Sequence, residues 1–258
     1  MKKIIISGKG GAGKSTFASL LAYVIAKKHP DKSMLLIDGD ASATLPLSLG
    51  IGEGFKKFTP VGELSPRVKS KEDEDKNMDQ FKEKCLMKIN LAGLPMDFAY
   101  MGHHSTKECF CGYNEALSLV LDSLDKNNSY DIVLVDREAG LEHLTRNVYP
   151  SSSDFLVLMS WLSDDYFNVI KEINDTADIL GSTKNRILVI NDILNNLKSE
   201  EDAKRFIEKY GLQISGWSAI GHINTGLLAE GKVNEMLESD KNLYASVSKV
   251  ADLIFNSN

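Results

Sequence analysis

Short runs of consecutive apolar residues alternate along this chain with longer stretches in which apolar residues recur every three or four positions. The continuous runs predict buried strands, and the periodic stretches predict helices with one buried face. We expect strands at 3–7, 34–37, 86–91, 132–135, 155–159, 187–190 and 212–220. Helices are expected at 14–28, 45–49, 164–180 and 199–210, and also through 117–124 and from 241 onward. A loop is expected at 93–102. This alternation indicates an α/β fold with a mostly parallel sheet and helices on both faces.

The pattern fades between about residues 52 and 84. Two prolines and the charge-dense run 69–76 interrupt this stretch, and only 78–84 keeps helical spacing. Such a composition predicts an exposed, charged insertion at about 52–84. The rest of the chain has no second apolar core of its own, so a single domain spanning 1–258 is expected.

Composition and charge exclude several classes of function. The 258 residues carry a formal net charge of -6, which disfavours sequence-independent binding of nucleic acid because such binding depends on basic patches. Three cysteines are too few for a disulfide scaffold, so a reducing compartment is expected. The start of the chain does not resemble a signal peptide, and no apolar run approaches the roughly 18 residues that span a bilayer. We therefore expect a cytoplasmic protein that binds neither membrane nor nucleic acid.

The segment Gly8–Thr16 joins the first predicted strand to the first predicted helix and matches the phosphate-loop pattern G-x-x-x-x-G-K-S. Glycines let the backbone turn its N–H groups inward, where these groups and the positive end of the helix hold phosphate oxygens. Lys14 is expected to reach the β- and γ-phosphates, and the Ser15 hydroxyl to ligate Mg²⁺. The predicted nucleotide-binding residues of this P-loop NTPase are Gly8, Gly10, Gly11, Ala12, Gly13, Lys14, Ser15 and Thr16.

Carboxylates follow two of the predicted strands, where open α/β sheets bind their ligands. Asp38 and Asp40 follow the strand at 34–37. One of them is expected to orient the water that attacks the γ-phosphate and the other to hold the Mg²⁺ shell, unless Asp38 only caps the next helical turn. Asp136 follows the strand at 132–135 in a Walker-B-like position, where a carboxylate contacts the hydration shell of Mg²⁺.

Cys109 and Cys111 are separated by one residue, so their thiolates project to the same side of an extended segment. Two thiolates supply half of a tetrahedral site for a soft metal ion. Three possibilities are open from the residues alone. His103 or His104 completes the site, a second subunit contributes an identical pair across a symmetric interface, or the cysteines are reduced loop residues without a metal.

A further lysine, Lys9, directly follows the first glycine of the phosphate loop. The resulting pattern, G-K-G-G-x-G-K-S-T, resembles the deviant phosphate loop of the MinD, ParA, ArsA and nitrogenase-iron-protein group of ATPases. The resemblance implies an ATP-dependent homodimer in which Lys9 reaches the nucleotide of the other subunit. It also implies that Asp40 orients the attacking water beside Lys9 and Lys14, and that Asn191, after the strand at 187–190, reads the adenine base. A helix-capping role is the alternative for Asn191.

Residues 109–117, which contain the cysteine pair, and residues 135–143, which contain Asp136, extend the resemblance to one branch of this group. That branch is the CooC-type nickel-insertion ATPases, which mature carbon monoxide dehydrogenase. The resemblance implies that Cys109 and Cys111 of each subunit share one Ni²⁺ or Zn²⁺ site at the ATP-dependent dimer interface. The expected partners are then a second copy of the chain and carbon monoxide dehydrogenase or a related metalloenzyme. Arg137 and the length of the charged insertion depart from the pattern of this branch.

Two alternatives to a metallochaperone ATPase use the same features. An iron–sulfur reductase of the nitrogenase-iron-protein kind would bridge a [4Fe–4S] cluster with the two cysteine pairs. A positioning ATPase of the MinD or ParA kind that binds a membrane would need a basic amphipathic tail. Residues 245–258 contain Lys249 as their only basic residue, so the membrane-bound version fits poorly.

Overall fold

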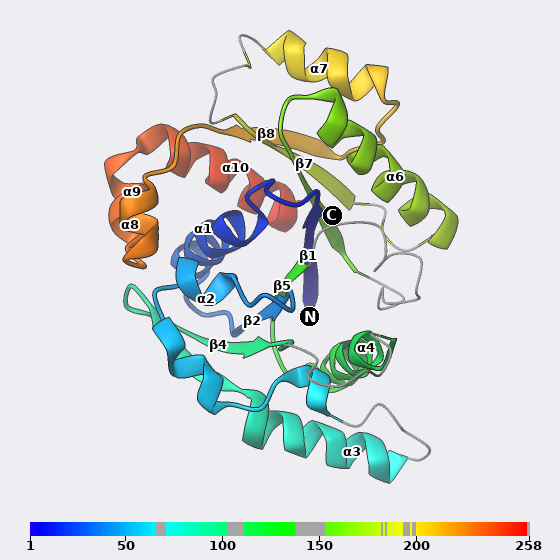
Figure 1. Ribbon diagram of the computed structural model, residues 1–258, viewed down its shortest axis with the longest axis vertical. Coiled ribbons are helices and arrows are strands. Elements are labelled where there is room, and N and C mark those ends of the chain that lie inside the picture. Colours follow the sequence, from blue (N-terminus) through cyan, green and yellow to red (C-terminus); the bar gives the residue numbers. More distant parts are fainter. Residues whose placement is uncertain are drawn as a thin grey trace.

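The fold is built on one sheet of eight strands (Figure 1). The computed structural model describes residues 1–64, 71–102, 111–137, 153–181, 183, 185–192, 197 and 200–256. The strand order is β3-β4-β2-β5-β1-β6-β7-β8, and every neighbouring pair is parallel except β3 with β4. The strands are Lys2–Gly8 (β1), Met34–Gly39 (β2), Met87–Leu91 (β3), Leu94–Tyr100 (β4), Ile132–Arg137 (β5), Phe155–Ser160 (β6), Asn185–Asn191 (β7) and Gly216–Ile220 (β8).

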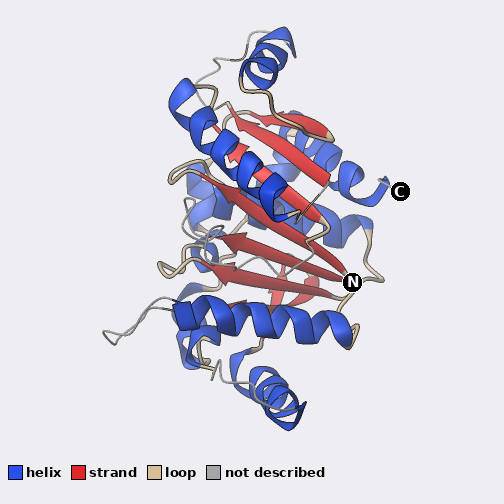
Figure 2. Cartoon of the chain, turned by 90° about the vertical axis from the view of Figure 1, so that its right-hand side faces the viewer, coloured by secondary structure: helices blue, strands red, loops and turns tan. Residues whose placement is uncertain are grey.

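Helices cover both faces of the sheet (Figure 1, Figure 2). Helices α1, α9 and α10 pack on one face, and α4, α6 and α7 pack on the other. The helices are Lys14–Lys28 (α1), Leu45–Ser48 (α2), Lys71–Gln80 (α3), Cys111–Lys126 (α4), Asp164–Leu180 (α6), Glu200–Lys209 (α7), Thr225–Ala229 (α8), Val233–Ser239 (α9) and Lys241–Asn256 (α10). The predicted α/β fold, with a mostly parallel sheet between two layers of helices, is confirmed.

Burial on both faces explains why the strands appear in the sequence as continuous apolar runs. In β1, Ile4 and Ile6 belong to the core under α1 and α10, whereas Ile5 belongs to the core under α4 and α6. Successive side chains of a strand point to opposite faces, so a strand covered on both sides must be apolar at consecutive positions.

The loop expected at 93–102 is instead strand β4, which forms an antiparallel hairpin with β3. Ala92 and Gly93 make the turn with positive φ angles of 51° and 89°, and the Asn90 side-chain oxygen accepts a hydrogen bond from the Gly93 N–H (2.6 Å). The prediction is wrong because Phe98 and its neighbours are buried, and β4 pairs with β2 in the sheet.

Part of the core lies within the predicted charged insertion. Helix α3 begins at Lys71, earlier than the helical spacing at 78–84 indicated, and a π-helical turn continues it from Phe81 to Cys85. Met78, Phe81 and Cys85 are buried in the core that includes α4. The expectation of exposure is therefore wrong for Met78 and Phe81, which lie on one face of a helix whose Glu72, Asp75, Lys76 and Asp79 are exposed.

The parallel strands all end at one edge of the sheet, as their arrowheads show (Figure 2). Within this edge, β1 lies between β5 and β6, and β2 lies beside β5. The loops that follow these strands are consequently neighbours in space. Among the described helices, none combines the length and the apolar character that crossing a bilayer requires.

Candidate functional site

The phosphate loop leaves β1 at Gly8 and enters α1 after Gly13, and both positions require glycine. Gly8 has a φ of 150°, and a β-carbon there would lie 2.3 Å from the carbonyl oxygen of Met159 in β6. Gly13 has a φ of 92°, and a β-carbon there would lie 2.6 Å from the Asn191 amide nitrogen. Close contact with two neighbouring strands thus fixes both ends of the loop and aims its backbone at the start of α1.

A pocket of about 490 Å³ opens above the loop and the N-terminus of α1. The predicted residues that line it are Gly10, Gly11, Gly13, Lys14, Ser15, Thr16 and Asp40. The residues that sequence reasoning missed are Thr44, Leu47 and Ser48 at and before α2, and Leu228 and Ala229 in α8. Backbone N–H groups at the positive end of a helix make this pocket suited to phosphate groups.

Lys14 and Ser15 begin α1 inside this pocket. Lys14 is only 8% exposed, and its Nζ donates a hydrogen bond to the carbonyl oxygen of Lys9 (3.3 Å). The ammonium group therefore lies over the loop, where a phosphate chain would bind. The Ser15 hydroxyl is hydrogen-bonded to the Thr44 hydroxyl (2.7 Å). Thr44 directly precedes α2, and no local sequence pattern marks it as a residue of the pocket.

The carboxylates of Asp38 and Asp136 are neighbours, since the two residues are paired in register across β2 and β5. Burial and the charge of Asp136 raise the pKa of Asp38 well above its ordinary value, although hydrogen bonds from the N–H groups of Asp40 and Leu45 oppose the shift. Those two bonds, at 3.0 and 2.9 Å, pin the start of α2 to Asp38. This is the capping role of Asp38, and its share in a Mg²⁺ shell stays a prediction.

Asp136 is 1% exposed, and within the described part of the chain neither carboxylate oxygen has a hydrogen-bond partner. Burial raises the pKa of this carboxyl to about 7, while the nearby Ser15 hydroxyl and Lys14 ammonium oppose the shift. The Ser15 hydroxyl lies close enough to Asp136 to lower its pKa, and it is also hydrogen-bonded to the Thr44 hydroxyl. A buried carboxylate with two unsatisfied oxygens beside a hydroxyl fits the oxygen ligands that Mg²⁺ prefers.

Asp40 and Asn191 lie on either side of the loop. The Asp40 carboxylate accepts a hydrogen bond from the Ser42 N–H (2.8 Å) and lines the phosphate pocket, and its role in orienting water stays a prediction. The Asn191 amide donates to the Ala12 carbonyl (3.0 Å), and its buried side-chain oxygen has no partner among the described residues. Asn191 thus braces the phosphate loop, while its role in reading adenine stays a prediction.

The predicted metal-binding cysteines cannot be placed against this pocket. His103, His104 and Cys109 lie outside the described residues, and Cys111 begins α4 with a side chain that is also outside them. Cys85 is fully buried, and burial raises the pKa of its thiol to about 12, so it is a core residue. The described part of the chain contains no cluster of three or more His, Cys, Asp or Glu side chains that would hold a metal ion.

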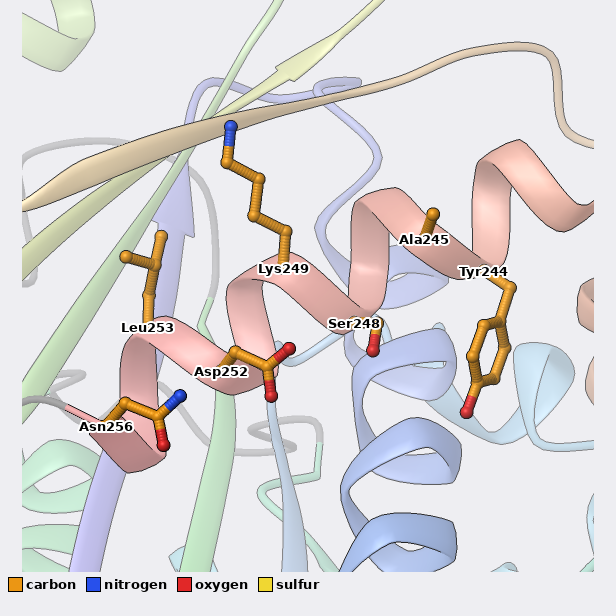
Figure 3. A pocket seen from close by; sticks show the side chains of 7 residues that line it. All are labelled: Tyr244, Ala245, Ser248, Lys249, Asp252, Leu253 and Asn256. Atoms are coloured by element: carbon orange, nitrogen blue, oxygen red, sulfur yellow. The ribbon is translucent and has the colours of Figure 1, made fainter.

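A second hollow, of about 600 Å³, runs along the outer face of α10 (Figure 3). Lys249 extends from this helix toward β8, where its Nζ lies 5.0 Å from the Trp217 ring centroid. Asp252 forms an ion pair with Lys28 of α1 (2.6 Å). All residues that line this second hollow come from α10, and its charged residues Lys249 and Asp252 already have partners. The smaller pocket above the phosphate loop is therefore the better candidate site.

Comparison with known proteins agrees with this geometry. The profile of the CobQ/CobB/MinD/ParA nucleotide binding domain matches residues 3–228. An uncharacterised ATP-binding protein of Methanocaldococcus jannaschii is 28% identical over 264 residues, which cover 98% of each chain. The carbon monoxide dehydrogenase accessory protein CooC of Rhodospirillum rubrum is 23% identical, over 80% of this chain and 79% of that protein.

The MinD cell division protein of Aquifex aeolicus has the same fold, with a TM-score of 0.69 at 18% identity over 100% of this chain and 98% of that one. The matched profile covers the phosphate loop together with Asp40, Asp136 and Asn191, so the predicted resemblance to the MinD and ParA group is confirmed at the level of the family. This chain belongs to the family of CobQ/CobB/MinD/ParA nucleotide-binding domains.

Proposed function

We propose that this chain is an ATPase that forms a homodimer when it binds ATP and Mg²⁺. The observation that carries this proposal is Asp136, a buried carboxylate without a hydrogen-bond partner in the described residues, close to Ser15 and Lys14. Such an arrangement is costly unless a cation neutralises the carboxylate. Mg²⁺ bound together with a nucleoside triphosphate would supply the neutralising positive charge. Ser15, Asp136 and Asp38 are the residues that would hold this Mg²⁺.

The residues of the pocket have separate roles in phosphoryl transfer. Lys14 and the loop N–H groups neutralise the β- and γ-phosphates, and Asp40 orients a water molecule. The oxygen of this water forms a bond to the γ-phosphorus as the bond to the β–γ bridging oxygen breaks, which yields ADP and phosphate. Mg²⁺, when bound, would neutralise charge on the phosphate oxygens. Lys9 would add a further positive charge from the second subunit.

We further propose that the dimer carries a nickel or zinc ion between its cysteine pairs. Cys109 and Cys111 supply two thiolates per subunit, and two subunits related by symmetry supply the four ligands of a tetrahedral site. The similarity to CooC supports a metalloenzyme client, carbon monoxide dehydrogenase or a related enzyme. ATP-driven closure would bring the two pairs together, and hydrolysis would release the metal.

The metal proposal is tested by native mass spectrometry of anaerobic protein supplied with Ni²⁺ or Zn²⁺, with and without ATP. We expect one metal ion per ATP-dependent dimer of the parent protein. The double variant Cys109→Ser/Cys111→Ser should still bind ATP but carry no metal. Cys85→Ala is the matched control and should keep the metal, because its thiol is buried in the core. Unchanged metal binding by the double variant would exclude the cysteine site.

The same preparation distinguishes the metallochaperone from the two alternatives, an iron–sulfur reductase and a positioning ATPase. Brown protein with iron–sulfur absorbance that disappears in the double cysteine variant would favour a reductase over a metallochaperone. A colourless dimer with no metal at the cysteines would favour a positioning ATPase.

A further inference from the structure

The outer side of the phosphate loop is held by residues 161–166, which run from the end of β6 into the first turn of α6. The Trp161 indole N–H donates a hydrogen bond to the carbonyl oxygen of Gly11 (3.2 Å), and the Tyr166 hydroxyl donates one to the carbonyl oxygen of Gly10 (3.1 Å). Both acceptors lie in the glycine-rich part of the loop, which has no side chains of its own to fix it. Two aromatic side chains therefore set the orientation of these peptide groups.

Lys9 is held by the same segment. Its Nζ forms an ion pair with Asp165 and lies 5.0 Å from the ring centroid of Tyr166. The Tyr166 ring in turn stacks on Trp161, with centroids 5.9 Å apart and an angle of 24° between the planes. A carboxylate and an aromatic face from the first turn of α6 thus direct Lys9 onto its own subunit.

These contacts are exposed, so they bias Lys9 without locking it. The Lys9 side chain is 33% exposed and that of Asp165 is 77% exposed. Solvent-exposed ion pairs and cation–π contacts are weak, and each corresponds to a preference of at most about fivefold. A nucleotide triphosphate chain carries more negative charge than one carboxylate, so it would attract the same ammonium group more strongly.

We infer that Asp165, Tyr166 and Trp161 are positioning residues for Lys9 and the phosphate loop. In the single subunit they hold Lys9 over the start of its own α6. Lys9 leaves Asp165 when the nucleotide of a second subunit is presented, so the strength of this contact sets the concentration at which dimers form. The inference rests on the proposed ATP-dependent dimer for its consequence, but the contact itself belongs to the single subunit.

The contact is tested first in nucleotide-free protein, through the rate at which an amine reagent modifies Lys9, followed by peptide mass spectrometry. In Asp165→Asn the rate is expected to rise about fivefold, because the ammonium group loses its charged partner. Asp164→Asn is the matched control, since Asp164 is the adjacent residue of the same helical turn but pairs with Lys209 and Tyr210. Equal rates in Asp165→Asn and Asp164→Asn would overturn the inference.

The consequence is tested by sedimentation of the same variants with ATP and Mg²⁺. Asp165→Asn is expected to dimerise at about 25-fold lower protein concentration than the parent, because each of the two subunits releases one Lys9 and each release contributes about fivefold, whereas Asp164→Asn should match the parent. In the labelling assay, Tyr166→Phe serves as a second test. It keeps the ring over Lys9 and loses only the hydrogen bond from the hydroxyl to Gly10, so its labelling rate should stay near that of the parent. A Tyr166→Phe rate equal to that of Asp165→Asn would contradict the assigned role of the ring.

The two measurements separate the two proposals. If Lys9 is released in Asp165→Asn but no variant dimerises with ATP, the positioning role stands and the proposed dimer fails. If the parent dimerises and Asp165→Asn behaves as Asp164→Asn in both assays, the dimer stands and the positioning role fails.

Discussion

The two sides of the phosphate loop are built in opposite ways. On the inner side, Lys14 and Asp136 are almost fully buried, and burial shifts the pKa of Asp136 to about 7. On the outer side, Lys9 and Asp165 are exposed and held by weak contacts. Burial strengthens electrostatic interactions with a bound ligand but makes unpaired charges costly, whereas exposure makes contacts easy to exchange. The inner side therefore suits fixed binding of phosphate and metal, and the outer side suits a group that changes partners.

The largest effect is expected from the inner side, with Lys14→Ala. Removing the ammonium group should lower the rate of ATP hydrolysis by at least about 100-fold, because no other described cation lies over this part of the pocket. Lys28→Ala is the matched control, since Lys28 ends the same helix and pairs with the distant Asp252. Steady-state phosphate release measures both variants. Equal activity of Lys14→Ala and the parent would show that Lys14 takes no part in ATP hydrolysis and would contradict the role assigned to the inner side.

Asp136→Asn tests whether the buried carboxylate lowers the free energy of unfolding of the free protein and whether bound Mg²⁺ and ATP offset this loss. The folded protein has a pKa of about 7 at this group, against an ordinary value of 3.8. Between about pH 4 and pH 7 the folded chain holds a proton that the unfolded chain has lost, so the free energy of unfolding falls as the pH rises through this range. The asparagine variant does not titrate and should escape this loss.

We therefore expect urea unfolding without Mg²⁺ or nucleotide to show Asp136→Asn as the more stable protein at pH 8. For a shift of about three pKa units the gain is at most ~4 kcal/mol, and it should shrink as the pH falls toward 5. Adding Mg²⁺ and ATP should stabilise the parent more than the variant. A variant that is less stable than the parent at both pH values would show that Asp136 is already satisfied in the free protein.

A smaller effect is expected at the back of the loop, with Asn191→Ala. Loss of the amide leaves the buried Ala12 carbonyl without its donor, so ATP affinity should fall about tenfold. If Asn191 also reads adenine, the preference for ATP over GTP should fall with it, and calorimetry with both nucleotides measures this. Asn185→Ala, at the other end of β7, is the control, because Asn185 bonds to Asp154. Equal losses for ATP and GTP would leave Asn191 only its bracing role.

The residues of the inner side were largely predictable from the sequence, whereas on the outer side only Lys9 was, and its contacts were not. Lys14, Ser15 and Asp136 occupy fixed positions in local patterns, a strand followed by a glycine loop or by a carboxylate. Trp161 and Tyr166 contact a loop about 150 positions earlier in the chain, because β6 lies beside β1 in the sheet. Strand order is a property of the whole fold, and the alternation of strands and helices does not determine it.

The same reason explains the errors in the fold. The segment expected to be a loop at 93–102 forms strand β4 because its burial depends on pairing with β2, which lies about 60 positions earlier in the chain. Leu228 reaches the nucleotide pocket from α8, a short helix that has too few residues to show a periodic pattern. Residues whose roles depend on distant partners carry little local signal.

The link between the two sides is tested most directly by sedimentation of the parent protein and Lys9→Ala, each with ATP and Mg²⁺. Lys9→Ala should bind ATP almost as well as the parent, because Lys14 and the loop N–H groups are unchanged, and should remain monomeric where the parent forms dimers. Dimerisation of Lys9→Ala with the same dependence on ATP as the parent would contradict the proposal that Lys9 joins two subunits through the nucleotide.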